Sequence, residues 1–188
     1  MSAAVMTERI REASPRRMAR ITGMVYLLAM LSGMLSVFVG GRWASLPYVI
    51  ATVANGAVAL LFYGIFKPVN RSLAVLAAFF GLLTTTLGVF KWHPRGVDIA
   101  LIFFGSYCLL IGYLIFRSPF MPRILGVLMA LAGIAWLTFL FPALTLVLSP
   151  YNMAAGALGQ GALILWLLVM GVNAERWKEQ AGAAQLQS

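Results

Sequence analysis

The chain is poor in the residues that most enzyme sites use. Its 188 residues include one His, one Cys and five acidic residues. One His and one Cys cannot supply the ligands of a typical zinc or iron site. No Gly-rich phosphate loop follows a strand, and no apolar stretch holds the paired carboxylates of proton-coupled pumps. The composition argues against an enzyme and predicts neither a metal nor a cofactor.

Apolar runs fill most of the chain instead. Hydrophobic residues make up 62% of it, charged residues 10%, and the mean hydropathy is +0.92, whereas a soluble domain carries roughly 25% charged residues. About 20 apolar residues are needed for a helix to cross a bilayer. Six stretches approach or meet that length: Ile21–Val39, Leu46–Phe66, Ser72–Phe90, Ile99–Phe116, Ile124–Leu148 and Tyr151–Val172. They predict an all-α integral membrane bundle of six transmembrane helices.

The basic residues are divided unequally between alternate connections. Three of the 14 flank one side, namely Arg42, Lys91 and Arg95. The other 11 flank the opposite side: Arg9, Arg11, Arg16, Arg17, Arg20, Lys67, Arg71, Arg117, Arg123, Arg176 and Lys178. Because basic loops stay in the cytoplasm, both termini are predicted to be cytoplasmic. The net charge of +9 then indicates contact with anionic lipid at the cytoplasmic face and does not indicate nucleic acid.

The two ends are expected to lie outside the bilayer. Residues 1–19 are expected to form an Arg-rich cytoplasmic arm, residues 20–174 the transmembrane domain, and residues 175–188 a cytoplasmic tail that frays after Trp177. The first apolar run is longer than the core of a signal peptide, and no small-x-small cleavage site follows it. It is therefore interpreted as a retained helix.

A repeat runs through the membrane region. Tyr-x-Ile-Phe-Lys at 63–67, followed by Arg-x-Leu-x-Val-Leu-x-Ala at 71–78, recurs as Tyr-x-Ile-Phe-Arg at 113–117 and the same string at 123–130. A fainter copy around Arg20 would join the first and last helices. The positive-inside rule also places Arg at such turns, and Leu, Ala and Gly are common in any membrane helix. If the repeat is structural, the helical hairpins are related by an axis along the membrane normal.

Polar residues near the middle of three stretches share one depth. They are Asn55, the pair Ser106 and Tyr107, and Gln160. Because an amide in hydrocarbon must find a partner, these side chains are expected to face protein and not lipid. One interpretation is interhelical hydrogen bonding that fixes helix register. The other is a central polar site that binds a small ligand.

The connection before the fourth stretch holds the only His and the only Asp. Its candidate residues are Lys91, His93, Arg95 and Asp98. Asp98 fits the first turn of a helix, where the helix dipole favours an anion and a nearby cation can pair with it. The alternative is an entry point for an anion or a proton at the outer mouth.

Small residues and prolines mark contacts and breaks. Small-residue stripes favour close helix contacts: Ala29, Gly33, Ser36 and Gly40; Gly105, Cys108 and Gly112; Gly126, Ala130 and Gly133; and Ala154 to Gly161. Pro142 and Pro150 bracket the end of the fifth stretch, which predicts a kink or break near Phe141.

Several strings resemble one family. They are the runs at 19–23, 67–74, 103–105, 112–118, 121–126 and 165–173, of which Gly-Tyr-Leu-Ile-x-Arg-Ser followed by Pro-Arg-Ile-Leu-Gly is the most specific. The chain thus resembles the bacterial domain of unknown function 4386 family over nearly its whole length. The resemblance implies a multi-pass inner-membrane protein of about six helices. Members often carry a His where Tyr107 stands and an Arg where Gly81 stands, and the connection between the first two helices is shorter here.

Two functions from different classes remain open. The first is a small binding or transport unit for a hydrophobic or amphipathic compound. The second is a structural or regulatory partner that binds another membrane protein, or a second copy of this chain, and has no ligand of its own. A central site at Asn55 and Gln160 would favour the first, and a lipid-facing stripe of small residues would favour the second.

The charge distribution makes a testable prediction about topology. Reporter fusions at Ser188 and within residues 91–96 should report opposite sides of the membrane, with Ser188 on the cytoplasmic side, because basic connections resist export. A periplasmic signal from Ser188 would contradict either the number of helices or their orientation.

Overall fold

The described part of the chain is almost entirely helical. The computed structural model describes residues 15–39, 41–90 and 99–185. Within these residues no strand occurs, and six helices are long and apolar enough to cross a membrane. A helix is the expected structure in a bilayer, because all of its backbone hydrogen bonds form within the segment. The spans are α2 (Pro15–Val39), α3 (Ser45–Phe66), α4 (Arg71–Phe90), α5 (Ile99–Arg117), α6 (Arg123–Leu137) with η3 (Thr138–Leu140), and α8 (Tyr151–Val169). The predicted all-α bundle of six spans is confirmed.

The fifth apolar stretch is not one helix, which corrects the predicted range of Ile124–Leu148. α6 passes into the 3-10 turn η3, Phe141 is extended with φ −116° and ψ 98°, and the short helix α7 (Pro142–Leu148) follows. Pro142 lacks the N–H that a continuous helix needs, so it serves as the first residue of a new helix. The break near Phe141 is the one that the prolines predict.

Both ends of the described chain are more helical than expected. α2 begins at Pro15, within the predicted arm of residues 1–19. The tail forms α9 (Ala174–Gln185), so the expectation that it frays is wrong. Gly171 adopts the left-handed conformation, with φ +69°, which turns the chain out of α8. The Asn173 side chain then accepts hydrogen bonds from the backbone N–H groups of Glu175 and Arg176, each at 3.2 Å, and so caps α9.

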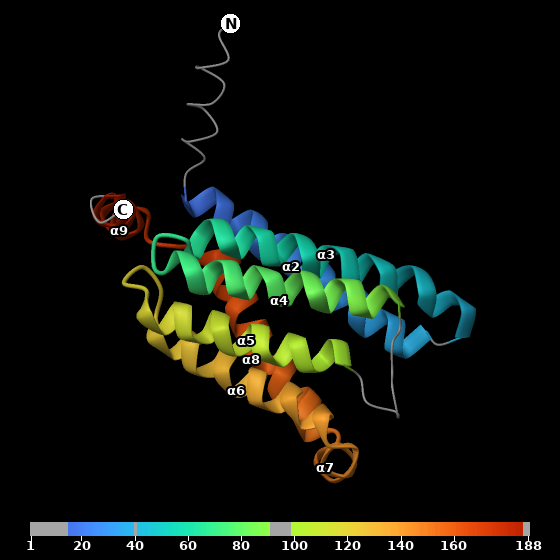
Figure 1. Ribbon diagram of the computed structural model, residues 1–188. Coiled ribbons are helices and arrows are strands. Elements are labelled where there is room, and N and C mark those ends of the chain that lie inside the picture. The colour runs from blue at the N-terminus through green and yellow to red at the C-terminus, as the bar shows by residue number, and fades with distance from the viewer. Residues whose placement is uncertain (1–14, 40, 91–98, 186–188) are drawn as a thin grey trace, which may run out of the picture.

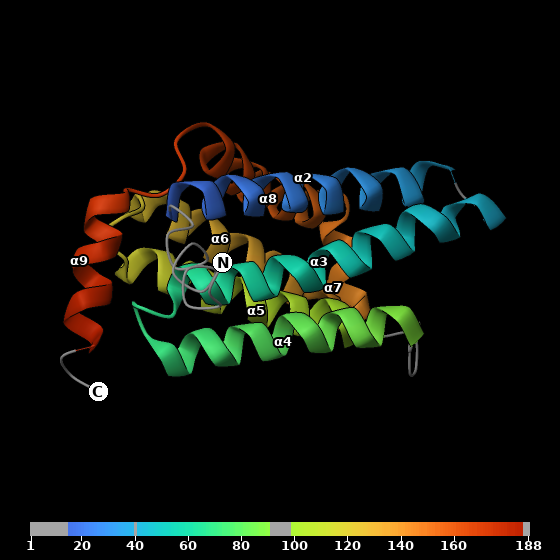
Figure 2. The same cartoon turned by 90° about the horizontal axis from the view of Figure 1, so that it is seen from above.

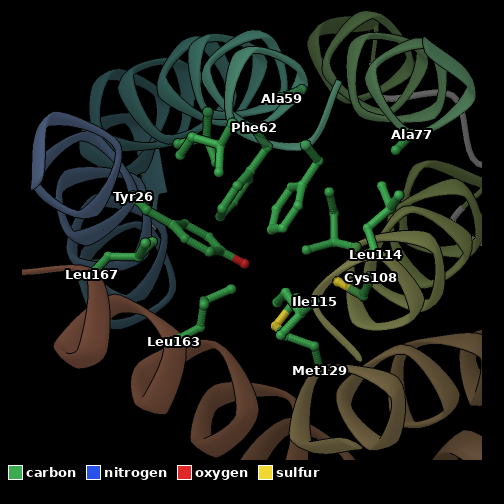
Figure 3. Close-up of a cluster of buried hydrophobic side chains, with 14 of the residues drawn as sticks. Tyr26, Ala59, Phe62, Ala77, Cys108, Leu114, Ile115, Met129, Leu163 and Leu167 are labelled. Atoms are coloured by element: carbon green, nitrogen blue, oxygen red, sulfur yellow. The ribbon is translucent and has the colours of Figure 1, made fainter. Parts of the chain in front are cut away.

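The six spans form a closed ring. Each span packs on the next along the chain, α6 packs on α8, and α8 closes the ring by packing on α2 (Figures 1 and 2). The centre is filled from all sides by side chains such as Tyr26, Phe62, Leu114, Met129 and Leu163 (Figure 3). Each of these five side chains is almost completely buried. The ring therefore has a solid apolar core where these residues meet.

One end of the ring gathers most of the basic residues. The α3–α4 and α5–α6 connections, the start of α2 and α9 all lie at that end, on the left in Figure 1. The basic residues there are Arg16, Arg17, Arg20, Lys67, Arg71, Arg117, Arg123, Arg176 and Lys178. We call it the basic end, and the opposite one the far end.

Helix α9 lies crosswise to the spans at the basic end, seen along its axis in Figure 1 and lengthwise in Figure 2. Trp177 Nε1 donates a hydrogen bond of 2.8 Å to the backbone oxygen of Ile65 in the last turn of α3. Arg176 donates to the oxygen of Pro119, between α5 and α6. The tail thus ties two connections of the ring together.

The two copies of the repeat differ in environment. Phe66 is 0% exposed, whereas its counterpart Phe116 is 46% exposed. The equivalent residues Ile65 and Ile115 are both buried, so the two strings differ in environment at this aromatic position and share the burial of the isoleucine. The proposed superposition of the two hairpins about a common axis stays a prediction.

Glycines bring the α5 and α6 backbones into contact. A Cβ atom added to Gly126 would lie 2.6 Å from the Gly112 backbone oxygen, and one added to Gly133 would lie 2.8 Å from the Gly105 oxygen. Such close approach is how membrane helices gain packing energy. The small-residue stripes predicted for these two helices face each other.

We therefore expect Gly126→Ala to destabilise the protein by about 1–3 kcal/mol, because the added methyl meets backbone that cannot move aside. Gly161→Ala is the matched control, since a Cβ there finds only Met30 Cε, at 4.0 Å. Unfolding in a denaturing detergent measures both changes. Equal stabilities of the two variants would show that the contact does not hold the helices together.

Candidate functional site

One interhelical polar pair joins the first and last spans. The Tyr26 hydroxyl on α2 donates a hydrogen bond of 3.1 Å to Gln160 Oε1 on α8. Gln160 Nε2 donates to the Gly156 backbone oxygen at 3.2 Å. Tyr26 is 1% exposed and Gln160 7% exposed, and the Tyr26 ring meets the Phe62 ring edge-on at 6.0 Å. For Gln160, the interpretation as an interhelical hydrogen bond is thus confirmed.

Tyr107 is buried with an unpaired hydroxyl. The residue is 2% exposed, and its hydroxyl has no hydrogen-bond partner among the described residues. Its ring stacks on Phe104, with centroids 6.0 Å apart. On the α4 side, a Cβ added to Gly81 would lie 3.3 Å from the Tyr107 ring. Gly81 and Tyr107, the two positions noted above as departures from the pattern that the sequence resembles, therefore lie next to each other.

Asn55 and Ser106 bond within their own helices. Asn55 Nδ2 donates to the Ala51 backbone oxygen at 3.1 Å, and Ser106 Oγ donates to the Ile102 oxygen at 3.1 Å. Both residues are half-buried. Among the described residues, no hydrogen bond links Asn55, Ser106, Tyr107 and Gln160 to one another. The structure therefore buries two of the four residues and does not assemble all four into one network.

The packed face of α3 changes character along its length. Toward the far end it carries Thr52 and the half-buried Asn55, and toward the basic end the buried Ala59, Phe62 and Phe66. The neighbouring α4 follows the same pattern, with Thr85 donating to the Thr52 and Gly81 backbone oxygens, followed by the buried Ala77 and Ala74. The polar groups thus lie in the far half, next to a core that closes the basic half.

The predicted outer mouth cannot be placed. Lys91, His93, Arg95 and Asp98 all lie outside the described residues. Within the described ranges, no group of three His, Cys, Asp or Glu side chains could hold a metal ion. The single cysteine, Cys108, is buried next to Tyr107 and forms no disulfide.

Tyr26 is the residue that the sequence reasoning missed. It lies near the start of the first apolar stretch, whereas the polar residues selected from the sequence were all on helices running toward the basic end. α2 runs away from the basic end, whereas α8 runs toward it. Tyr26 therefore reaches the depth of Gln160 near the start of its stretch, and a search for residues at one distance from the cytoplasmic end of the inbound helices does not include it. The sequence feature that could have identified it is a tyrosine within an otherwise apolar run. A tyrosine in such a run also fits anchoring at the membrane interface.

The fold and the buried polar pair define a multi-pass helical membrane protein. Comparison with known families adds a match to the family described as Domain of unknown function (DUF4386), over residues 84–171. This match runs from the last turns of α4 to Gly171, just after α8, and confirms the family resemblance over these residues. A relative from Archaeoglobus fulgidus, described as an uncharacterized protein, is 27% identical in an alignment of 130 residues that covers 63% of this chain and 78% of the relative. No solved structure matches the chain.

The Tyr26–Gln160 pair makes a double-mutant prediction. Tyr26→Phe and Gln160→Leu should each cost about 1–2 kcal/mol, because each leaves a buried partner unsatisfied. The double variant should lose less than the sum of the two, with a coupling of roughly 0.6–1.7 kcal/mol. Reversible unfolding in mixed micelles measures the cycle. Strict additivity would mean that the hydrogen bond contributes nothing to closing the ring.

Proposed function

We propose that this protein binds a small hydrophobic or amphipathic compound inside the far half of the helix ring. The observation that carries the proposal is the Tyr107 hydroxyl, which is buried and has no partner among the described residues. An unsatisfied buried hydroxyl costs about 1–3 kcal/mol. A ligand with an acceptor oxygen would accept a hydrogen bond from this hydroxyl and remove that cost.

The surroundings suit a compound with one polar end. Asn55 is half-buried, and within the described part of the chain its hydrogen bond goes only to its own helix, so its side-chain oxygen is free to accept. Phe104 lies against the Tyr107 ring and offers an apolar surface to the rest of the molecule. Few polar groups in an apolar setting are typical of small-molecule sites.

The packing of the basic half supports binding over free passage. Phe62, Phe66, Leu114 and Leu163 are 0–1% exposed, and they meet at the centre of the ring (Figure 3). A compound that entered from the far half would stop at this core. Transport through the ring would require these side chains to move apart.

The role of a partner subunit without a ligand has weaker support. Its expected mark was a stripe of small residues facing the lipid. The glycines of the predicted stripes instead contact neighbouring helices of the same chain: Gly105 and Gly112 meet α6, while Gly156 and Gly159 meet Trp136 and Leu128. These glycines are thus used for contacts within the ring, which leaves less of the small-residue surface for a second subunit.

The same proposal includes an orientation. The basic end would face the cytoplasm of the inner membrane, where Arg- and Lys-rich connections are retained. The far half, with Tyr107 and Asn55, would then be reached from the periplasmic side or from the outer leaflet. Anionic lipid would contact the basic end.

The test is the compound that purifies with the protein. The wild-type protein, extracted from membranes and analysed by mass spectrometry, should carry a small molecule that is about tenfold depleted in Tyr107→Phe, since a hydrogen bond of roughly 1.4 kcal/mol is lost. Asn55→Leu should also lower its content. Tyr151→Phe is the matched control, because it removes the same atom from a residue that is 76% exposed.

Folded Tyr107→Phe protein with the wild-type content of every co-purified molecule would contradict the proposal. So would wild-type protein that carries nothing beyond the bulk lipids. Circular dichroism and the unfolding midpoint of each variant separate loss of a ligand from loss of the fold.

A further inference from the structure

An apolar groove runs along the outer surface of the ring between α5 and α6. It has a volume of about 280 Å³. Its floor is formed by Gly112, Gly126 and Ala130, and its rims carry the exposed side chains of Tyr113, Phe116 and Val127. The groove lies outside the ring, so it is separate from the proposed interior site.

The groove is a consequence of the glycine contact. Gly112 and Gly126 bring the two backbones together, and both residues line the groove at this contact. Phe116 and Tyr113 stand beside this floor and are nearly half exposed. The surface is therefore hollow where most of the ring presents protruding Leu, Ile and Phe side chains to the bilayer.

Two cations lie near the end of the groove, Arg123 through its contact with Phe116 and Arg117 as the residue that follows Phe116. Arg117 ends α5 and Arg123 begins α6, and both are exposed. The Arg123 guanidinium carbon lies 5.7 Å from the centroid of the Phe116 ring, which lines the groove. The acidic residues in the described ranges, Glu175 and Glu179, both belong to α9. A negative charge supplied from outside would thus complement these two cations.

The length of the groove identifies the kind of occupant. From Leu109 to Arg117, α5 rises about 12 Å, at 1.5 Å per residue. This distance is close to the hydrocarbon of one leaflet, which is about 15 Å, or half of a ~30 Å core. One acyl chain therefore fits along the groove.

We infer that the α5–α6 groove is a binding site for one anionic phospholipid of the leaflet at the basic end. An acyl chain lies on Gly112, Gly126 and Ala130, and the phosphate contacts Arg123 and Arg117. Phe116 holds the Arg123 guanidinium beside the chain through a cation–π contact.

The experiment is native mass spectrometry of the detergent-purified chain titrated with dioleoylphosphatidylglycerol. Arg123→Gln should weaken the first binding event about fivefold, the contribution of one arginine to contact with anionic lipid. Arg71→Gln is the matched control, since Arg71 begins α4 as Arg123 begins α6 and is its counterpart in the repeat. It should change binding less than twofold.

A second pair of measurements tests the groove itself. Val127→Trp fills it from its exposed rim without touching the glycine contact, and should also weaken binding while both arginines remain. Dioleoylphosphatidylcholine should bind the wild-type chain more weakly than the anionic lipid.

Three outcomes would overturn the inference. Equal losses of lipid affinity in Arg71→Gln and Arg123→Gln would mean that the total charge of the basic end attracts the lipid and that no specific site binds it. Unchanged lipid binding in a folded Val127→Trp variant would mean that the groove is not used. A wild-type dimer that Val127→Trp dissociates would assign the groove to a second copy of the chain.

Discussion

Glycine at the helix junctions is the constraint on which the ring depends. In a bilayer no hydrophobic force drives helices together, so the packing of close surfaces must do so. A glycine stands at each junction: Gly23 against Leu167 between α2 and α8, Gly64 against Met18 between α2 and α3, Gly81 between Ala59 of α3 and Tyr107 of α5, Gly112 against Gly126 between α5 and α6, and Gly159 against Leu128 between α6 and α8. At α5–α6 the contact is backbone to backbone, and this pair also leaves the groove on the outer surface. The same residues therefore shape both the interior and the exterior of the ring.

The interior of the ring has a closely packed apolar part and a part that contains polar groups. In the basic half, aromatic and branched side chains fill the centre and shut it. From mid-depth toward the far end, Thr52, Asn55 and Tyr107 add polar groups to the interior, and the Tyr107 hydroxyl has no partner among the described residues. The proposed binding function rests on this unpaired hydroxyl.

The sequence was sufficient to predict where the helices lie along the chain. It was not sufficient to predict which faces of those helices contact one another. Runs of about 20 apolar residues determine the six spans, and Pro142 determines the break at Phe141, because both effects are local. The amphipathic α9 was missed because its stability comes from Trp177 bonding to Ile65 and from the Asn173 cap, contacts that depend on where α3 ends in space. The polar residues at mid-depth were found, but their partners were not. Tyr26 meets Gln160 across 134 positions of sequence, and no spacing rule relates them.

The closure of the ring by its first and last spans has a consequence for synthesis at the membrane. A ribosome delivers α2 first and α8 last, so the chain must hold five spans in the bilayer before the sixth can complete the circle. Throughout that interval Gly23 lacks its α8 neighbour Leu167, and the Tyr26 hydroxyl has no Gln160 to bond. The nascent protein is thus an open crescent that contains one polar group without its partner. The ring can close only after α8, the last span, has entered the membrane.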